Sequence, residues 1–439
     1  MSNLKAADLI IRSLGERTIT SPLDKFFSQI GSDHAFYSDD HRIAADHRLG
    51  KIMHGEEIPC FEAAGPRRNI YFKPSEVKIG IITCGGLCPG LNDVIRAIFM
   101  QAYYRYGVQD IFGIPYGYEG LIPEYGHRIM KLTPEYVSNI HTFGGTAIGT
   151  SRGPQSISRM VDRLSELGIN ILFVIGGDGS QRGALAIESE ARGRGIQLAV
   201  VGVPKTIDND LIYMDKSFGY ETACAAAVDA INAAHTEARS SRNGVGLVKL
   251  MGRHSGFIAS SAAIASGEVN CVLIPETPFA LEGDNGFLEY IRQRVNDRHH
   301  AVVIVAEGAG QELFGDHASN ATDASGNTKL SDIGPYLKKR IEEYFKKCKT
   351  EINLKYIDPS YIIRSVPASP QDRIYCMRLA QAAVHAAMAG KTGLVVARWH
   401  STYVHVPMSV VTHHRRTVDT GGDLWLSVLE STGQPARFH

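Results

Sequence analysis

The sequence predicts an α/β protein with two Rossmann-like lobes, mostly parallel sheets and an N-terminal arm. From about residue 77 onward, short runs of apolar and β-branched residues alternate with helical patterns, which is typical of βαβ units. The run Ile171–Ile175 is apolar at every position, which favours a central parallel strand covered on both faces. A length of 439 residues allows two or three domains and a large core.

We expect the arm at residues 1–75, a first lobe at 76–219 with about 372–412 returning to it, and a second lobe at 220–371 with about 413–439. Within the arm, the pattern favours an amphipathic helix at Leu4–Leu14. The arm contains Phe26, Phe27, Phe36 and Phe61, which need burial, so we expect the arm to pack on the body or on a neighbouring subunit.

The formal charges balance, with 46 Lys and Arg against 46 Asp and Glu. This balance argues against nucleic acid or a membrane surface as the main partner. The seven cysteines are scattered and odd in number, which suits a reducing compartment better than a disulfide framework. No apolar run is long enough to cross a bilayer, and the N-terminus does not resemble a secretory signal. We therefore expect a cytoplasmic protein.

The first strand of the lobe, Val77–Thr83, runs into a glycine-rich turn, Cys84–Asn92, and then into a helix. This arrangement offers backbone N–H groups to a phosphate, although glycine equally permits close packing of a strand on a helix. A second segment, Gly144–Gly153, is dense in glycine and hydroxyl groups and carries Arg152, whose guanidinium can bind phosphate through two hydrogen bonds.

Two further strands end in groups suited to phosphate chemistry. Ile171–Ile175 ends in Gly176–Ser180, where an acid between glycines, Asp178, suits Mg²⁺ beside phosphates; an ordinary turn is the alternative. The apolar run Leu198–Val203 ends in Pro204–Asp210, which places a lysine, a hydroxyl, an amide and two carboxylates close together. Open α/β sheets bind ligands at the carboxyl ends of their strands, although a surface turn could also carry such a cluster.

The rest of the chain continues the alternation. We expect helices at about Tyr220–Ala238, from a cap at Asp332 through Lys347, and at Ile374–Ala389, and strands at Val245–Lys249, Val272–Ile274 and Ala301–Ala306. Near the end, Arg364 and Arg373 flank a proline-rich turn and could form an anion clamp. Two ordinary surface arginines are the alternative.

Together these motifs are more specific than any one of them. In chain order they are Gly85-Gly86, Gly-Gly-Asp-Gly-Ser at 176–180, Lys-Thr-Ile-Asp-Asn-Asp at 205–210, Met-Gly-Arg at 251–253, and the late arginine pair. The pattern resembles the phosphofructokinases over roughly residues 77 to 420. It is most similar to the ATP-dependent subgroup of plants and trypanosomatids.

The resemblance implies a role for each motif. Asp208 would accept the proton of the sugar C1 hydroxyl, while Thr206 and Asp210 would hold that hydroxyl and the phosphates or metal. Arg152 and Arg253 would stabilise the moving phosphoryl group, because phosphoryl transfer needs mainly positioning and charge neutralisation. The nucleotide phosphates would be bound by Gly86, Arg152, Gly177, Asp178, Gly179, Ser180 and Gly183, with Mg²⁺ on Asp178. Fructose 6-phosphate would be bound by Met251, Gly252, Glu307, Arg364 and Arg373, with Arg364 reaching over from a neighbouring subunit.

The resemblance also bears on the phosphoryl donor. Pyrophosphate-using relatives have Asp where Gly179 stands, and that carboxylate would occupy the place of the ATP α-phosphate. Gly179 therefore favours ATP. Lys205 is the residue of the pyrophosphate type, but the plant and trypanosomatid ATP enzymes combine it with this glycine.

The expected activity is thus Mg²⁺-dependent transfer of the γ-phosphoryl group of ATP to fructose 6-phosphate, giving fructose 1,6-bisphosphate in glycolysis. The alternatives are the same reaction with pyrophosphate and a catalytically silent, sugar-phosphate-binding regulatory subunit. The resemblance further implies a homo-oligomer, either a dimer or a tetramer. No complete effector site is legible in the sequence.

Overall fold

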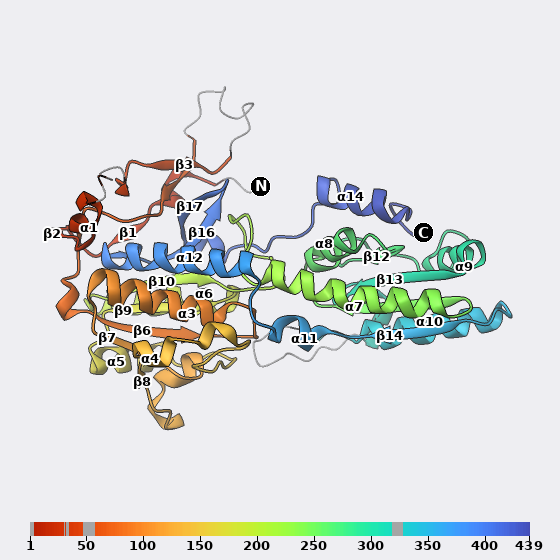
Figure 1. Ribbon diagram of the computed structural model, residues 1–439, viewed down its shortest axis with the longest axis horizontal. Coiled ribbons are helices and arrows are strands. Elements are labelled where there is room, and N and C mark those ends of the chain that lie inside the picture. Colours follow the sequence, from red (N-terminus) through yellow and green to blue (C-terminus); the bar gives the residue numbers. More distant parts are fainter. Residues whose placement is uncertain (1–3, 30, 32–34, 47–57, 318–327) are drawn as a thin grey trace. The chain divides into compact units, whose positions relative to one another are not determined.

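The computed structural model describes residues 1–439 apart from 1–3, 30, 32–34, 47–57 and 318–327 (Figure 1). The chain forms two compact units, each assembled from separate stretches. Unit 1 comprises Met1–Thr206, Leu211–Gly219 and Pro367–His414, and unit 2 comprises Ile207–Asp210, Tyr220–Val366 and Arg415–His439. Within the described ranges, no helix has the length and apolar character needed to traverse a lipid bilayer.

A nine-stranded mixed sheet forms the centre of unit 1. From edge to edge its strands are β3 (Arg42–Ala44), β4 (Cys60–Ala63), β17 (Thr402–Pro407), β16 (Leu394–Trp399), β10 (Ala199–Pro204), β9 (Ile171–Gly176), β6 (Lys78–Thr83), β7 (Asp110–Gly113) and β8 (Met130–Lys131). The five strands from β16 to β7 are parallel, and the outer strands pair antiparallel. Every residue of β9 and β10 is buried, as their continuous apolar runs predict.

Helices cover both faces of this sheet. They are α1 (Leu23–Gln29), α3 (Leu91–Met100) with its π-helical extension η4 (Gln101–Tyr106), α4 (Pro134–Val137), α5 (Ile157–Leu167), α6 (Asp178–Gly193), α12 (Pro370–Met388) and α13 (Met408–Val411), with 3₁₀ turns η3 (Pro74–Glu76), η5 (Gly117–Leu121), η6 (Pro123–Tyr125) and η7 (Ile140–Thr142). Leu172 and Val174 of β9 pack with buried residues of α5 and α6. Because side chains alternate along a strand, Ile171 and Phe173 face the other side, where α3 and α12 lie next to each other (Figure 1).

Unit 2 has a parallel sheet of its own. Its strands, in order across the sheet, are β12 (Cys271–Leu273), β13 (His300–Ala306), β11 (Gly244–Leu250) and β14 (Asn353–Ile357); its helices are α7 (Tyr220–Ser240), α8 (Phe257–Ser266), α9 (Phe287–Arg298), α10 (Ile333–Lys347), α11 (Ser360–Ser365) and α14 (Asp423–Thr432), with a 3₁₀ segment, η8 (Gln311–His317). Val245 and Leu247 of β11 pack with α9 and α10. A Cβ on Gly246 would lie 3.1 Å from the Cβ of Ala234, so glycine here lets α7 approach the opposite face closely. The predicted α/β class with mostly parallel sheets is confirmed.

The described residues among the first 75 belong to unit 1 and do not form a unit of their own. β3 and β4 extend the large sheet beyond β17, and two short pairs fasten the beginning of the chain: β1 (Arg12–Ser13) with β15 (Lys391–Thr392), and β2 (Ile19–Thr20) with β5 (Asn69–Ile70). The predicted helix at Leu4–Leu14 is wrong, because only the turn η1 (Ala6–Leu9) is helical. Ile10 is exposed and Ile11 is buried, as in an extended segment, and pairing with β15 overrides the helical pattern.

A cluster of buried charges links the arm to the rest of unit 1. Glu62 of β4 pairs with Arg67 at 2.9 Å and with Lys391 at 3.0 Å, and it accepts a hydrogen bond from Nδ1 of His405 at 3.0 Å. Asp39 lies 3.0 Å from the same Arg67 and the same Lys391. Burial raises the pKa of Glu62, but the hydrogen bond and the neighbouring cations outweigh burial and lower that pKa to about 2.

Replacing Lys391 by Met should lower the free energy of unfolding by about 3 kcal/mol, because the buried carboxylate of Glu62 loses one of its cations. Since the folded pKa of Glu62 lies below its ordinary value of 4.5, the contribution is complete above pH 4.5 and disappears as the pH falls toward 2. Denaturant unfolding at pH 7 and at pH 3 measures both effects. Lys25→Met, which removes an exposed lysine of α1, is the control; equal stability of the two variants at pH 7 would contradict the linking role.

Candidate functional site

The predicted phosphate-binding segments of unit 1 lie at the carboxyl ends of three adjacent strands, β6, β9 and β10. Along the chain, β6 is followed by β7 on one side, and the later strands β9, β10 and β16 lie on the other side. Open α/β sheets bind ligands at such a switch point. The structure therefore brings Gly86, Gly177, Asp178, Gly179 and Lys205 to one edge of the sheet.

Lys205 holds the first glycine turn in place. Its side chain is 6% exposed, and Nζ donates a hydrogen bond of 2.6 Å to the carbonyl of Gly86. Gly85 has a φ of +87°, and a Cβ there would lie 3.2 Å from the same Nζ, so the turn needs glycine for its conformation and for its space. Sequence reasoning assigned Lys205 to the choice between pyrophosphate and ATP as phosphoryl donor. It missed this contact, which depends on the adjacency of β6 and β10 to β9.

The segment that carries Arg152 is fastened to the same turn. Gly85 donates its N–H to the carbonyl of Ser151 at 3.0 Å, and Oγ1 of Thr150 donates to the carbonyl of Gly85 at 2.8 Å. The Arg152 side chain is exposed and forms no hydrogen bond with any residue in the described part of the chain. Its guanidinium is therefore available to an anion near the glycine turn.

The helix α6 begins at the Gly-Gly-Asp-Gly-Ser motif, with Asp178 in its first turn. The first N–H groups of a helix have no partner within the helix, and the helix dipole makes this end attractive to anions. A Cβ built on Gly179 meets nothing within 4 Å, so the space beside this turn is open. A Cβ on Gly183 would instead lie 2.8 Å from the ring of Tyr118, which gives Gly183 a packing role.

The carboxylate of Asp178 pairs with Arg182, one turn further along α6, at 2.7 Å. Sequence reasoning missed Arg182, although its i, i+4 spacing from an acid is a signal for such a pair. Nowhere in the described ranges do three or more His, Cys, Asp or Glu side chains form a group that could hold a metal ion. A single carboxylate at a helix N-terminus fits Mg²⁺, which takes one or two protein carboxylates together with substrate phosphates and water.

The predicted sugar-binding residues of unit 2 also follow adjacent parallel strands. Strand β13 ends beside Glu307, and strand β11 ends beside Met251 and Gly252. Strand β14 ends beside Asp358. Gly252 has a φ of +132°, and a Cβ there would lie 2.5 Å from the carbonyl oxygen of Ser255. The turn after β11 therefore requires glycine, which explains the second residue of the Met-Gly-Arg motif.

Glu307 lies close to several cations. Burial raises the pKa of Glu307, and the charges of Arg253, Lys249 and Arg364 oppose that rise. Arg253 also donates a hydrogen bond of 2.8 Å to the carbonyl of Thr328. The structure thus assembles Glu307, Arg253 and Arg364 from three separate sequence segments.

Lys249 is a residue of this site that sequence reasoning missed. Its Nζ lies 2.9 Å from the Asp332 carboxylate and 2.8 Å from the Asp358 carboxylate, and these contacts anchor the end of β11. The available signal is a lone charge in an otherwise apolar strand. Asp332 also accepts a hydrogen bond from the N–H of Gly334 at the beginning of α10, which confirms its predicted capping role.

Asp208 and Asp210 lie in the stretch Ile207–Asp210, called the acidic loop below, which belongs to unit 2. Oγ of Ser255 donates to the backbone carbonyl of Asp208 at 2.9 Å, and the N–H of Arg416 donates to the carbonyl of Asp210 at 2.7 Å. Thr206 precedes them on the chain and belongs to unit 1. The acidic loop is therefore the point at which the chain passes from the phosphate-binding segments to the sugar-binding segments.

The two arginines predicted to form one clamp belong to different units. In unit 2, the guanidinium of Arg364 lies over the ring of Tyr361, 4.8 Å from its centroid. In unit 1, Nε of Arg373 donates to the carbonyl of Ala368 at 2.9 Å and lies 4.0 Å from the carboxylate of Asp93. Neither unit alone contains the clamp.

The fold is that of an α/β protein with two units, one built on a mixed sheet and the other on a parallel sheet, and comparison with known proteins identifies its family. The sequence profile described as phosphofructokinase matches residues 78–387, and the chain belongs to the phosphofructokinase family. It is 49% identical over 444 residues to an ATP-dependent 6-phosphofructokinase of Amycolatopsis methanolica, covering 98% of this chain and 96% of that protein. It is also 49% identical over 374 residues to an ATP-dependent 6-phosphofructokinase of Trypanosoma cruzi, covering 84% of this chain and 76% of that protein.

A relative from Arabidopsis thaliana, again an ATP-dependent 6-phosphofructokinase, is 49% identical over 377 residues, covering 86% of this chain and 77% of that protein. Among solved structures, a pyrophosphate-dependent phosphofructokinase from Marinobacter aquaeolei has a TM-score of 0.66 at 22% identity, covering 82% of this chain and 93% of that chain. An identity this low shows a shared fold alone. The predicted resemblance, with relatives in a plant and a trypanosome, is confirmed.

Proposed function

We infer that this chain is an ATP-dependent 6-phosphofructokinase, which transfers the γ-phosphoryl group of ATP to the C1 hydroxyl of fructose 6-phosphate. The observation that carries this inference is 49% identity to the Amycolatopsis enzyme over nearly the full length of both chains. The relatives from Trypanosoma and Arabidopsis, which carry the same activity in their descriptions, support it. A silent regulatory subunit would have no need of a base, yet Asp208 is present.

Unit 1 is the proposed nucleotide-binding part. The open first turn of α6 offers N–H groups to phosphate oxygens, the turn at Gly86 lets the backbone approach them, and Arg152 neutralises their charge. Asp178 would hold Mg²⁺, and the ion, when bound, offsets charge on the β and γ phosphates. Lys205 shapes the glycine turn through its bond to the Gly86 carbonyl.

Unit 2 is the proposed sugar-phosphate-binding part. The Glu307 carboxylate accepts hydrogen bonds from fructose hydroxyls, and the neighbouring cations favour the ionised form that this role needs. Met251 and Gly252 line the same place at the end of β11. Arg373 of unit 1 offers its guanidinium group to the 6-phosphate, and the Arg364 side chain of a neighbouring copy offers a second one.

Asp208 is the proposed base. The oxygen of the C1 hydroxyl bonds to the γ-phosphorus, the bond from that phosphorus to the ADP oxygen breaks, and the hydroxyl proton passes to the Asp208 carboxylate. Thr206 and Asp210 position the hydroxyl. Arg253 and Arg152 stabilise the charge on the phosphoryl oxygens during transfer.

Replacing Asp208 by Ser should lower kcat by about 10²–10⁴-fold, because a base acts in the transition state, while the KM for fructose 6-phosphate changes little. A coupled assay of fructose 1,6-bisphosphate formation measures both constants. The matched control is Asp229→Ser on the exposed face of α7, which should retain parental kinetics. A large rise in KM with intact kcat would contradict the assigned role.

Gly179→Asp should suppress activity with ATP, because the new carboxylate enters the open space beside the first turn of α6. The control is Gly193→Asp at the other end of the same helix, where a Cβ likewise meets nothing within 4 Å. Initial rates with ATP and with pyrophosphate separate the two donors. Equal ATP-dependent turnover in the two variants would overturn the steric explanation. A parental protein that is active with pyrophosphate but inactive with ATP would overturn the proposed donor.

We propose that the protein is a homo-oligomer in which Arg364 serves the site of a neighbouring copy. Tyr361 and Ile362, beside it on α11, are 75% and 65% exposed, and such apolar side chains suit a protein contact. Sedimentation velocity should show a dimer or a tetramer, and Tyr361→Ser combined with Ile362→Ser should shift the distribution toward monomer. A parental protein that sediments as a monomer at assay concentrations would exclude this arrangement.

A further inference from the structure

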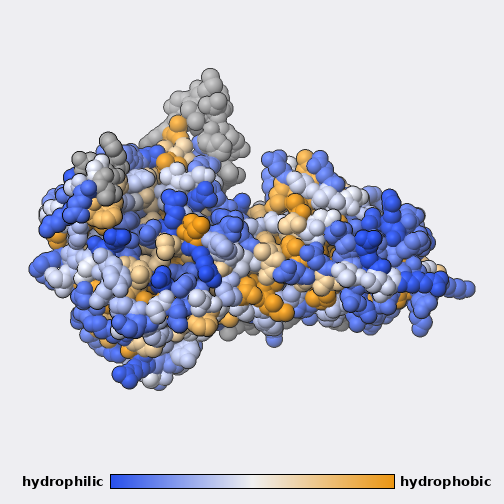
Figure 2. Space-filling model, viewed as in Figure 1, coloured by the Kyte–Doolittle hydropathy of each residue, from blue (hydrophilic) through white to orange (hydrophobic). Residues whose placement is uncertain are grey.

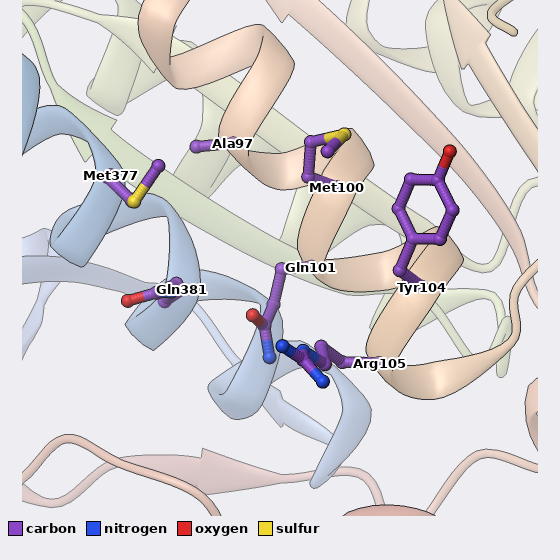
Figure 3. Close-up of a pocket in the computed structure, with 7 residues that line it drawn as sticks. All are labelled: Ala97, Met100, Gln101, Tyr104, Arg105, Met377 and Gln381. Carbon is purple, nitrogen blue, oxygen red and sulfur yellow. The ribbon is translucent and has the colours of Figure 1, made fainter. Parts of the chain in front are cut away.

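A cavity of about 540 Å³ lies in unit 1 between α3, its extension η4, and α12 (Figure 3). Its lining includes Met100, Gln101, Tyr104 and Arg105 on one side and Met377 and Gln381 on the other. The volume falls in the range of small-molecule sites. None of these residues belongs to the motifs assigned to phosphoryl transfer.

Gln101 is the feature that points to a ligand. It is only 8% exposed, and its side-chain amide forms no hydrogen bond with any residue that the structure describes. The amide atoms are not among the fully enclosed unpartnered polar atoms of the described residues, so they face the accessible space of the cavity. Figure 3 shows the side chain extending from its helix into the space that the other lining residues surround. The amide is therefore open to a ligand with a hydrogen-bonding edge.

The backbone at Gln101 is also unusual. The regular helix α3 ends at Met100, and the π-helical turn η4 begins at Gln101. A π-helical turn is a locally widened helix, and such turns occur frequently at functional sites. The amide and the widened turn therefore coincide at one residue of the cavity.

The remaining side chains define the chemistry of the ligand. Met100 and Met377 are flexible, polarisable side chains that adapt to a flat apolar body. Among the described residues that line the cavity, Arg105 is the only charged one, and none carries a carboxylate. The guanidinium of Arg105 is held over the ring of Phe26, 4.7 Å from its centroid. The surface view in Figure 2 shows hydrophobic residues among hydrophilic ones on this face, and Met377 is 44% exposed. This composition favours an anion over a cation.

We propose that this cavity binds a small organic carboxylate with a flat apolar body. Arg105 pairs with the carboxylate, Gln101 forms a hydrogen bond with a polar edge of the body, and the two methionines pack against its faces. The site is separate from the residues that bind ATP and fructose 6-phosphate, and the proposal does not depend on the proposed function.

The probes are indole-3-acetate and its neutral analogue indole-3-acetamide. Full-length protein labelled with ¹³C at the methyl groups of its ten methionines is titrated with each probe, in the presence of saturating ATP and fructose 6-phosphate without Mg²⁺. We expect indole-3-acetate to shift the signals of Met100 and Met377, which are assigned with Met100→Leu and Met377→Leu. Indole-3-acetate should bind about tenfold more tightly than the amide, because its carboxylate forms charge-assisted hydrogen bonds.

Two variants test the assigned contacts. Arg105→Gln should weaken indole-3-acetate about tenfold and leave indole-3-acetamide unchanged, because only the carboxylate uses the guanidinium. Gln101→Leu, which has nearly the same volume, should weaken both probes. The control Arg192→Gln removes an exposed arginine of α6 and should affect neither probe.

The outcomes that overturn the proposal are distinct from one another. Unshifted signals of both methionines mean that the cavity holds only water. Equal affinity for the two probes, or undiminished carboxylate binding in Arg105→Gln, means that the cavity does not select an anion. If saturating ATP or fructose 6-phosphate abolishes binding of the probe, the probe occupies the catalytic site.

Discussion

The short stretch of chain between Lys205 and Asp208 is the constraint on which the proposed chemistry depends. Lys205 is bonded to the Gly86 carbonyl in unit 1, and the backbone of Asp208 is bonded to Ser255 in unit 2. Three residues of chain separate the two anchored positions, so the Cα atoms of Lys205 and Asp208 are at most about 11 Å apart. This stretch is therefore anchored at one end to the glycine turn of unit 1 and at the other end to Ser255 of unit 2.

Glu62 and Glu307 show how the distance to nearby cations decides whether the pKa of a carboxylate falls or rises. Glu62 makes direct contacts of about 3 Å with Arg67, Lys391 and His405, and these contacts overcome burial, so its pKa falls. For Glu307, burial is the largest influence and the nearby cations act without a direct hydrogen bond, so its pKa rises. Lys249 already forms ion pairs with Asp332 and Asp358, which weakens its effect on the pKa of Glu307. The direct contacts of Glu62 suit a fixed structural link. The Glu307 carboxylate, in contrast, can accept hydrogen bonds from sugar hydroxyls.

Local signals account for most of what could be predicted. Unbroken apolar runs predict the strands β9 and β10. Gly85 and Gly252 lie where the backbone has a positive φ and little space for a side chain. The helix expected at Leu4–Leu14 failed because its end pairs with residues 391–392, which no local pattern reveals. The sequence did not predict the roles of Lys249 and Arg182, because these roles depend on which side chains lie beside them in the folded chain. No local pattern indicated that the two arginines proposed to bind the 6-phosphate, nine positions apart, lie on either side of a boundary between units.

The order of strands in the large sheet also has a consequence for biosynthesis. β4, near the beginning of the chain, reaches the sheet only through β17, and β17 reaches β10 only through β16. A ribosome completes β4 at residue 63 and does not finish the hairpin of β16 and β17 until residue 407. The edge of β4 that pairs with β17 therefore has no partner during most of translation, although β4 can already pair with β3. These two strands join the large sheet last although they are made first. Contacts of such long range are slow to form, so the nascent chain has to keep an unpaired strand edge from aggregating until its final segments emerge.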